Sequence, residues 1–456
     1  MTKQTSRTTS ASLPDRSRSA VAPAPSIQQV GVLVPVSDTA ASAISPATEI
    51  PIDAAPTVIG HDPSNGIRLG DSHHPRKHAL LYPGHGHCYV EDGGTVAGTF
   101  LNDTRVRACR LVAGDHIRFG DDSLWRFGTR WCAADEKSIE PRGLPPMLQS
   151  RSRDEFLVTF WGCRGSMPMS GPHMNAIGGQ STSIEIRYND RIVLIDAGTG
   201  LFRLSQSWRE EFGKAPLDFH LFFTHLHWDH IQTFPFFAQA YQSGNRLRIH
   251  GATGMAAPIE TSLRQLMQQH NFPVGMDAMK ATFSFDEISP GWSVDGLVVD
   301  TFPVPHPGGS MAYRIQAPTG TFLFATDCEL DHLAANRDAV EADQKLPREY
   351  PDEMLRFFRD VDLLVVDCQY SDEQYAARCG WGHNSVSSVI ELCRQTRPGS
   401  VGLTHHDPLA DDLQVAKNVE TVRAALLSCL GEKSPSVFAA REEMTVCVSR
   451  PRETRR

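Results

Sequence analysis

Long apolar runs are missing from this sequence of 456 residues, and so is the apolar core of a secretory signal near its start. A membrane-spanning helix needs about 20 consecutive apolar residues, and no stretch of the chain approaches that length. The first 26 residues are instead rich in Ser, Thr, Arg, Ala and Pro. These absences argue against a helical membrane protein and predict a cytoplasmic location.

Paired cysteine motifs and an excess of positive charge are missing as well. None of the ten cysteines stands in a CxxC pattern, so we expect reduced thiols that mostly pack in the interior. The chain has 44 Lys and Arg against 53 Asp and Glu, a net charge of −9. An acidic protein lacks the many cations with which a large nonspecific nucleic-acid platform binds phosphates. A small anionic substrate held by a metal ion stays compatible with this charge.

The residues that are present divide the chain into four segments. Residues 1–26 lack hydrophobic periodicity and are predicted to be disordered. Residues 27–132 hold short apolar runs separated by Gly, Asp, Asn and Pro, which predicts an all-β domain. Residues 133–153 are polar, contain three prolines and predict a linker. From 154 to 450 strand-like and helix-like stretches alternate, which predicts an α/β domain.

Histidines concentrate in one short segment of the α/β domain. Residues 224–230 read THLHWDH and directly follow the apolar run FHLFF. This density is too high for packing alone, and imidazole is a common ligand of zinc. Because side chains alternate along an extended strand, His225 and His227 face the same way. A turn after them lets Asp229 and His230 face a second ion, so the segment predicts part of a metal site.

Further candidate ligands end other predicted strands. His306 follows the run LVVDTFPV, Asp327 follows TFLFA, and His405 follows SVGLT. Side chains at the ends of several strands are a usual construction of sites on α/β scaffolds. Histidines combined with a carboxylate suit borderline metals better than calcium or magnesium. His406 is adjacent to His405, so alternation is expected to turn it away from the site.

Residues from about 156 to 449 resemble the metallo-β-lactamase fold superfamily, whose hallmark HxHxDH is the segment 225–230. The closer resemblance is to ribonuclease Z and to related cyclic and small-molecule phosphodiesterases. It rests on GCRGS at 162–166, GGQST at 178–182, LIDAGTG at 194–200 and GHNS at 382–385. The resemblance implies an αβ/βα sandwich with two metal ions at the edge of its two sheets.

Position by position, the resemblance also implies a set of seven metal ligands. One metal takes His225, His227 and His306, the second takes Asp229, His230 and His405, and Asp327 bridges both. Zn²⁺ is the expected ion, with Mn²⁺ or Fe²⁺ as alternatives. Asp196 is expected to hold a ligand histidine in its tautomer, and Asp367 to act in the same way.

The implied reaction is the hydrolysis of a phosphodiester by a water that two metal ions activate. Asp229 is expected to orient that water or to accept its proton. His383 matches the family's histidine near the leaving group and is predicted to be the general acid. The alternative for His383 is a structural histidine at a helix start, hydrogen-bonded to the backbone.

The length of one segment bears on the substrate. Ribonuclease Z enzymes that process transfer RNA carry a long arm between the third histidine and the bridging aspartate. Here only the 20 residues 307–326 occupy that interval, and they must form two strands. We therefore predict a small or cyclic phosphodiester, such as a cyclic nucleotide. The alternatives are a ribonuclease-like nuclease and a hydrolase of lactones or thioesters.

Aromatic residues follow the histidine motif. Trp228, Phe234, Phe236 and Phe237 are predicted to pack in the interior, with stacking on a substrate base as the alternative.

The front domain resembles a forkhead-associated (FHA) domain, a β-sandwich whose loops bind phosphothreonine. The resemblance rests on IGHDPSN at 59–65, PRKHA at 75–79, GTFLN at 98–102 and GDHIRFG at 114–120. Where that family has an arginine, a serine and an asparagine, this chain has His61, Pro75 and Ala97. Losing the guanidinium fork and two hydrogen-bonding groups removes most phosphate contacts. The resemblance therefore implies the fold, without phosphothreonine dependence.

Partners follow from the two resemblances. The substrate is expected to be a small anion, and no membrane partner is expected. A signalling scaffold, in which the FHA-like domain recruits a protein partner, is the alternative from a different functional class. A homodimer is compatible with the resemblance.

Overall fold

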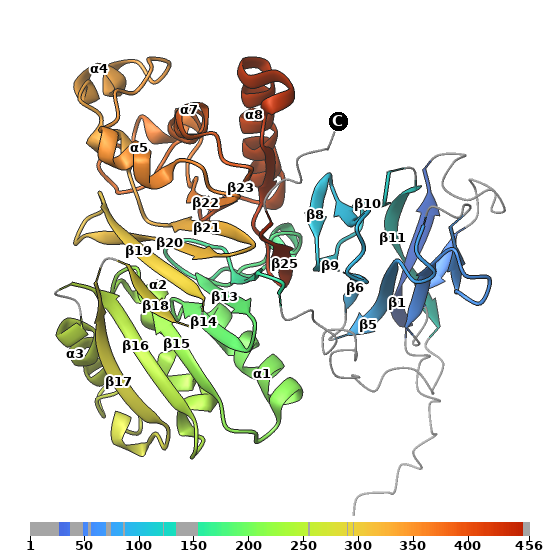
Figure 1. The fold of residues 1–456 in the computed structure, drawn as a ribbon, viewed down its shortest axis with the longest axis horizontal. Helices are drawn as coiled ribbons and strands as arrows, with labels where there is room; N and C mark the ends of the chain where they lie inside the picture. Colours follow the sequence, from blue (N-terminus) through green and yellow to red (C-terminus); the bar gives the residue numbers. More distant parts are fainter. Residues whose placement is uncertain are drawn as a thin grey trace, which may run out of the picture.

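The computed structural model describes residues 27–36, 49–52, 56–69, 74–84, 87–121, 123–133, 154–253, 256–289, 291–294 and 296–449. The predicted disordered segment 1–26 lies outside the described residues, and so does the predicted linker except for its first residue. Figure 1 shows an all-strand front part beside a larger part in which helices cover sheets. No helix within the described ranges is long and apolar enough to cross a membrane.

Two sheets form the front part. The first is composed of β1 (Ile27–Pro35), β2 (Ile50–Ile52), β7 (Thr99–Leu101), β8 (Thr104–Val106), β10 (His116–Phe119) and β11 (Ser123–Ala133). The second contains β3 (Thr57–Gly60), β4 (Ile67–Arg68), β5 (Ala79–Gly84), β6 (His87–Asp92) and β9 (Ala108–Leu111). Buried side chains of both sheets, such as Leu33, Ile59 and Leu81, share one apolar core. The predicted β-sandwich is confirmed.

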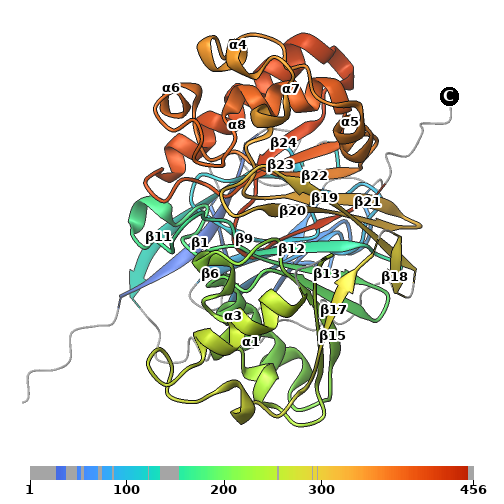
Figure 2. The same ribbon diagram turned by 90° about the vertical axis from the view of Figure 1, so that its left-hand side faces the viewer.

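Two sheets pack face to face in the larger part, as Figure 2 shows, and one of them continues the second sheet of the front part. One contains β12 (Leu157–Gly162), β13 (Ser183–Tyr188), β14 (Arg191–Ile195), β15 (Asp218–Phe222), β16 (Arg246–Ala252), β17 (Thr282–Ile288) and β25 (Met444–Cys447). The other contains β18 (Trp292–Val294), β19 (Leu297–Val304), β20 (Ser310–Ala317), β21 (Gly320–Ala325), β22 (Leu363–Asp367), β23 (Ser400–Thr404) and β24 (Ser436–Ala439). Strands β21 and β22 are buried along their whole length, as expected for strands covered on both faces.

Helices cover the outer face of each sheet. Helices α1 (Gly200–Phe212) and α3 (Ala256–Leu266) lie on the sheet that contains β12 to β17, and their apolar residues join one buried cluster. Helices α5 (Asp352–Phe358), α7 (Val386–Thr396) and α8 (Asp412–Leu430) lie on the sheet that contains β18 to β24. The predicted αβ/βα sandwich is therefore confirmed. Helix α7 begins after Ser385, whose side chain accepts a hydrogen bond from the Ser388 N–H and caps the helix.

The described residues also contain short helical segments. They are α2 (Trp228–Ile231), α4 (Arg337–Ala342), α6 (Asp372–Tyr375), η2 (Pro172–Met174), η3 (Phe234–Phe236), η4 (Ala238–Tyr241), η5 (Met276–Ala278), η6 (Leu330–Leu333) and η7 (Gly431–Lys433).

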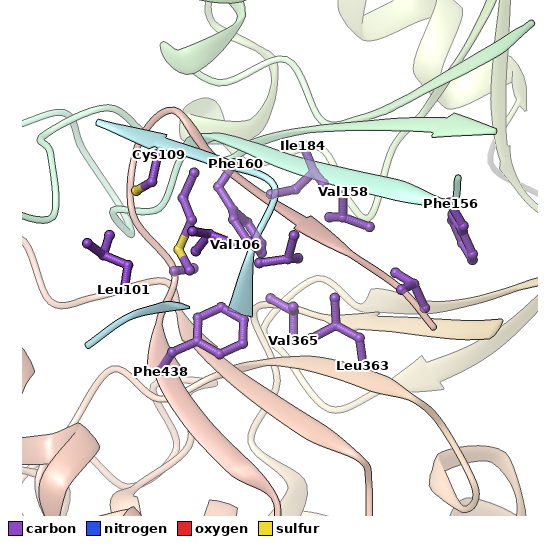
Figure 3. Close-up of a cluster of buried hydrophobic side chains, with 14 of the residues drawn as sticks. Leu101, Val106, Cys109, Phe156, Val158, Phe160, Ile184, Leu363, Val365 and Phe438 are labelled. Atoms are coloured by element: carbon purple, nitrogen blue, oxygen red, sulfur yellow. The ribbon is translucent and has the colours of Figure 1, made fainter. Parts of the chain in front are cut away.

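The two parts of the protein share a continuous sheet. Strand β25 pairs with β12 on one edge, and Thr445 pairs with Ala108 of β9 on the other. The sequence VFAAREEMTVCV predicts a final strand or hairpin, but β24 and β25 belong to different sheets. Apolar side chains from both parts meet beside this junction, where Val106 lies near Phe160 and Phe438 (Figure 3).

Buried polar contacts reinforce the junction. The guanidinium of Arg441 donates to both carboxylate oxygens of Asp115, at 3.1 and 2.9 Å. The Tyr89 hydroxyl donates to Glu443, which also accepts from Arg203 of α1. Front domain, C-terminal strand and first helix of the larger part are thus connected directly.

Candidate metal centre

Six strands carry the site residues at their carboxyl ends. Asp196 follows β14, the histidine motif follows β15, His306 follows β19, Asp327 follows β21, Asp367 ends β22, and His405 follows β23. Three of these residues, Asp196, Asp327 and His405, have left-handed backbone with φ of 63°, 47° and 55°. This conformation is uncommon outside glycine and concentrates at functional sites. Asp327 and His405 contribute ligand atoms to the groups described below, and Asp196 contacts the ring of His230.

The first group of converging atoms belongs to His225, His227, His306 and Asp327, whose ligand atoms lie within 4.8 Å of one another. Nε2 of His306 lies 3.0 Å from Nδ1 of His227. Oδ1 of Asp327 lies 3.7 Å from Nε2 of His225 and 3.6 Å from Nε2 of His306. Three imidazoles and one carboxylate oxygen therefore face a common point.

The second group consists of Asp229, His230, Asp327 and His405. Nε2 of His230 lies 3.2 Å from Asp229 Oδ2 and 3.1 Å from Asp327 Oδ2. Nε2 of His405 lies 3.4 Å from Asp229 Oδ2 and 3.0 Å from Asp327 Oδ2. Asp327 contributes its Oδ1 to the first group and its Oδ2 to the second. The seven predicted ligands are thus brought together as two groups that share one carboxylate.

These donors fit divalent cations. Among the described residues, Nε2 of His225, His230 and His405 is buried without a hydrogen-bond partner. A buried polar atom without a partner is unfavourable, and such atoms are rare unless an ion or water satisfies them. Imidazole nitrogens and carboxylate oxygens that converge in this way match the donor preference of zinc and similar metals.

The opposite nitrogen of most of these histidines is held by a neighbour. Nδ1 of His230 lies 2.7 Å from Asp196, whose carboxylate also accepts from the N–H and hydroxyl of Thr224. Nδ1 of His306 lies 2.9 Å from the Gly382 carbonyl, and Nδ1 of His405 lies 3.2 Å from Oε1 of Gln369. Such contacts fix the ring orientation and leave Nε2 directed at the centre.

Charge in the centre is reflected in its pKa values. Burial opposes ionisation of Asp229, but the neighbouring His230 and His405 outweigh it and lower the pKa of the carboxyl. Burial likewise opposes ionisation of Asp327, and the histidines around it hold its pKa well below the ordinary value. Burial acts to lower the pKa of His405, but Asp327 and Asp229 raise it to about 8. The two carboxylates thus stay ionised.

His383 lies beside the second group. Its Nδ1 is 2.7 Å from Oδ2 of Asp367, and its ring stacks on His405 with centroids 4.9 Å apart. Asp367 is itself held by the N–H groups of Gln369 and Asn384. The structure pairs this imidazole with a carboxylate, not with the backbone as in the structural alternative. His406 points away, with Nε2 3.1 Å from the Ala440 carbonyl.

The GCRGS loop closes against the centre. The Ser166 N–H donates to Oδ2 of Asp229 at 2.8 Å. A Cβ at Gly165 would lie 2.5 Å from the His405 ring, so only glycine lets the loop approach this closely.

The rim of the site is more aromatic and exposed than the sequence suggests. Phe234 and Phe237 are buried as predicted, but Trp228 is 61% exposed and Phe236 is 56% exposed, so the packing prediction is wrong for these two. Trp228 lies on the one-turn helix α2, and Phe236, on η3, contacts only the edge of the Phe272 ring among aromatic side chains of the described residues. Trp381 is also 60% exposed.

Arg378, a cation near the site, was not identified in the sequence analysis. The Arg378 guanidinium lies 5.1 Å from the Tyr370 ring and 5.9 Å from the Trp381 ring. The Tyr370 ring in turn contacts the His383 ring, with centroids 5.9 Å apart. Lone arginines are common, and no pattern in the sequence distinguishes this one.

Comparison with known proteins places the chain among characterised families. The family description "Beta-lactamase superfamily domain" matches residues 191–406, and "FHA domain" matches residues 57–120. Ribonuclease Z of Staphylococcus carnosus is 29% identical over 285 residues, which cover 54% of this chain and 87% of the relative. Ribonuclease Z of Staphylococcus epidermidis is 30% identical over 288 residues, with the same shares. The structure of human tRNase Z, short form, is 15% identical with a TM-score of 0.44, covering 64% of this chain and 100% of that one.

Proposed function

Because the chain belongs to the metallo-β-lactamase superfamily, in its ribonuclease Z-like branch, we propose that it is a phosphodiesterase acting on small or cyclic phosphodiesters. The general kind, a metal-dependent hydrolase with an FHA domain in front, follows from the family. The observation that carries the finer proposal is the pairing of two converging donor groups with the adjacent His383–Asp367 dyad.

The metal ligands proposed are the seven residues of the two groups. His225, His227 and His306 would hold one ion, Asp229, His230 and His405 the other, and Asp327 both. When bound, two such ions supply a water of lowered pKa and positive charge that stabilises the phosphoryl oxygens. The mixture of nitrogen and oxygen donors favours Zn²⁺, with Mn²⁺ or Fe²⁺ as alternatives.

Asp229 is proposed to orient the attacking water. The Ser166 N–H fixes its Oδ2, so the direction of the carboxylate is set before substrate arrives. Gly165 allows this loop to reach Asp229 without displacing His405. Because the Asp229 carboxylate is already oriented, no substrate binding energy is needed to reorient it.

His383 is proposed to donate the proton to the leaving oxygen. Asp367 accepts from Nδ1–H, so that in the imidazolium the second proton, on Nε2, is the one available to the substrate. The N–H groups of Gln369 and Asn384 keep this carboxylate in place. Proton transfer by a group positioned in this way contributes about 10²–10⁴-fold to rate.

Substrate size is inferred from the segment between His306 and Asp327. Strands β20 and β21 form a hairpin whose connection is only residues 318–319. That interval contains no extended arm with which to grip a transfer RNA. Arg378, held near Tyr370 and Trp381, offers a cation at the rim that suits a further anionic group of a small substrate.

A substrate panel tests this proposal. Bis-p-nitrophenyl phosphate, cyclic nucleotides, a precursor transfer RNA and a lactone are assayed with and without a chelator. We expect turnover of the small phosphodiesters that the chelator abolishes, and little cleavage of the RNA. Efficient RNA processing, or lactone hydrolysis without phosphodiester turnover, would overturn the substrate assignment.

For the FHA domain, we propose recruitment of a protein partner without phosphothreonine dependence. His61, Pro75 and Ala97 supply none of the phosphate-binding groups of that family. Because β9 shares a sheet with β25, binding is measured on the full chain. Equal affinity for phosphorylated and unphosphorylated peptides is expected, and a strong preference for phosphothreonine would contradict the proposal.

A further inference from the structure

A third cluster of metal-ligating side chains lies outside the centre described above. Glu329, His332 and Cys379 place one donor atom each within 4.8 Å of one another. Glu329 and His332 belong to the turn around η6, and Cys379 lies in the loop after α6. We propose that this cluster binds a third divalent ion of the zinc type, with Glu341 of α4 as the fourth donor.

The donor atoms converge on one point. Nε2 of His332 lies 3.2 Å from Glu329 Oε1, 3.9 Å from Glu341 Oε1 and 4.0 Å from Cys379 Sγ. Tetrahedral zinc, with bonds of about 2.0–2.3 Å, leaves roughly 3.3–3.8 Å between its ligand atoms. The separations around Asp327 in the catalytic groups, from 3.0 to 3.7 Å, are of the same kind.

The geometry does not fit a catalytic relay. In a cysteine–histidine–carboxylate relay, one imidazole nitrogen faces the thiol and the other faces the carboxylate. Here the same nitrogen of His332 faces Glu329, Glu341 and Cys379. A single nitrogen directed at several acceptors is the arrangement of ligands around a shared cation.

The charge of the cluster also calls for a cation. Glu329 is almost fully buried, and its oxygens accept from the Tyr375 hydroxyl at 2.8 Å and the N–H groups of Gly380 and Gly382 at 2.7 Å. Among the described residues, no lysine or arginine forms an ion pair with Glu329. A buried carboxylate without a fixed positive partner is costly, and a bound metal ion removes that cost.

The cluster adjoins the catalytic loop. Glu329 holds the N–H groups of Gly380 and Gly382, and the Gly382 carbonyl orients His306 through its Nδ1. His383 is the next residue in the chain. An ion at the third site therefore fixes the loop that carries the proposed general acid, without itself touching the substrate. The site stands independently of the reaction proposed above.

Substitution with Co²⁺ distinguishes the third site from the two catalytic metal sites by spectroscopy. Neither catalytic group contains sulfur, and among the candidate metal groups of the described residues only the third includes a cysteine. The near-ultraviolet thiolate-to-Co²⁺ charge-transfer band is therefore expected from the third site. Full-length protein loaded with Co²⁺ should show that band, and the zinc-loaded protein should hold three ions per chain. Cys379→Ser should lose the band and one ion, whereas Cys429→Ser, at an exposed cysteine, should keep both.

Further variants keep the test decisive. Asp229→Ala should retain the band even if turnover is lost, which separates this proposal from the proposed phosphodiesterase. His332→Gln should lose the band while circular dichroism stays that of the wild type. A wild-type protein without the band, or a band and metal content unchanged in Cys379→Ser, would overturn the third site.

Discussion

The carboxylate of Asp367 lies 2.7 Å from Nδ1 of His383, and the imidazole of His383 stacks on His405. The pair is buried at the end of β22, directly beside the second donor group. His405 faces the shared carboxylate of Asp327, and in the proposed reaction His383 serves the leaving oxygen instead. The predictions below follow from this division and from the packing around it.

Removing the imidazole of His383 should slow the reaction without removing metal. For His383→Ala we expect kcat to fall about 10²–10⁴-fold, because the leaving oxygen loses its proton donor. Metal content should stay at the wild-type value. A leaving group that needs no protonation, such as p-nitrophenolate, should show a smaller loss than an alkoxide. Loss of metal in His383→Ala would assign the residue to the ligand set instead.

Asp196 acts through His230 and should affect metal affinity. Asp196→Ala removes the acceptor that orients His230, so we expect metal binding to weaken about 10–100-fold. The measurement is activity during titration of chelated protein with Zn²⁺. Asp277→Asn, at an exposed carboxylate on η5, serves as the matched control and should titrate like the wild type. Unaltered affinity in Asp196→Ala would rule out the orienting role.

Arg378 should affect substrate binding more than chemistry. We expect Arg378→Ala to raise KM about tenfold for a substrate with a second anionic group, which corresponds to roughly 1.4 kcal/mol, and to leave kcat nearly unchanged. The effect should be much smaller for bis-p-nitrophenyl phosphate, which has one negative charge. Arg356→Ala on the exposed surface of α5 is the control. A purely kcat effect would contradict a role in binding.

The junction between the two parts should depend on Arg441. Arg441→Met leaves Asp115 as an unpaired buried carboxylate, and breaking such a pair costs about 3–5 kcal/mol. Replacing both partners with apolar residues should cost much less. The measurement is the free energy of unfolding in urea for both single variants and the double variant. Equal losses in the single and double variants would contradict a coupled pair.

The same ion pair predicts a pH dependence. Burial opposes ionisation of Asp115, but Arg441 outweighs it, so the pKa of the carboxyl lies below its ordinary value. A lowered pKa in the folded state means that the stabilisation is present above the ordinary carboxyl pKa and is lost as pH falls through the lowered one. Wild type should therefore lose stability on acidification relative to Asp115→Asn. Parallel pH profiles for the two proteins would contradict this contribution.

Much of the centre was predictable because its residues follow recognisable buried strands. The runs before His225, Asp327 and His405 are apolar enough to be identified as interior strands, and the ends of such strands are where α/β scaffolds usually carry their sites. The third cluster left no comparable signal. His332 and Cys379 are 47 residues apart, and only the packing of two loops brings them together. The sequence therefore assigned Cys379 to ordinary packing.

The sheet that joins the two parts could not be predicted from the sequence either. Thr445 and Ala108 pair through backbone groups at strand edges, and these groups are the same in every residue. The exposure of Trp228 depends on a helix of one turn directly after His227, too short to show hydrophobic periodicity. The roles of the seven ligands and of His383 stay predictions from the family pattern and the geometry.

The most direct test of the proposed phosphodiesterase is the hydrolysis of bis-p-nitrophenyl phosphate by wild type and by Asp327→Ala, whose lost carboxylate serves both donor groups. Each protein is treated with a chelator and then titrated with Zn²⁺. We predict that chelation stops hydrolysis, that Zn²⁺ restores it in the wild type, and that no Zn²⁺ concentration restores it in Asp327→Ala. Hydrolysis that persists in the chelator, or that Asp327→Ala carries out at the wild-type rate, would contradict the two-metal centre.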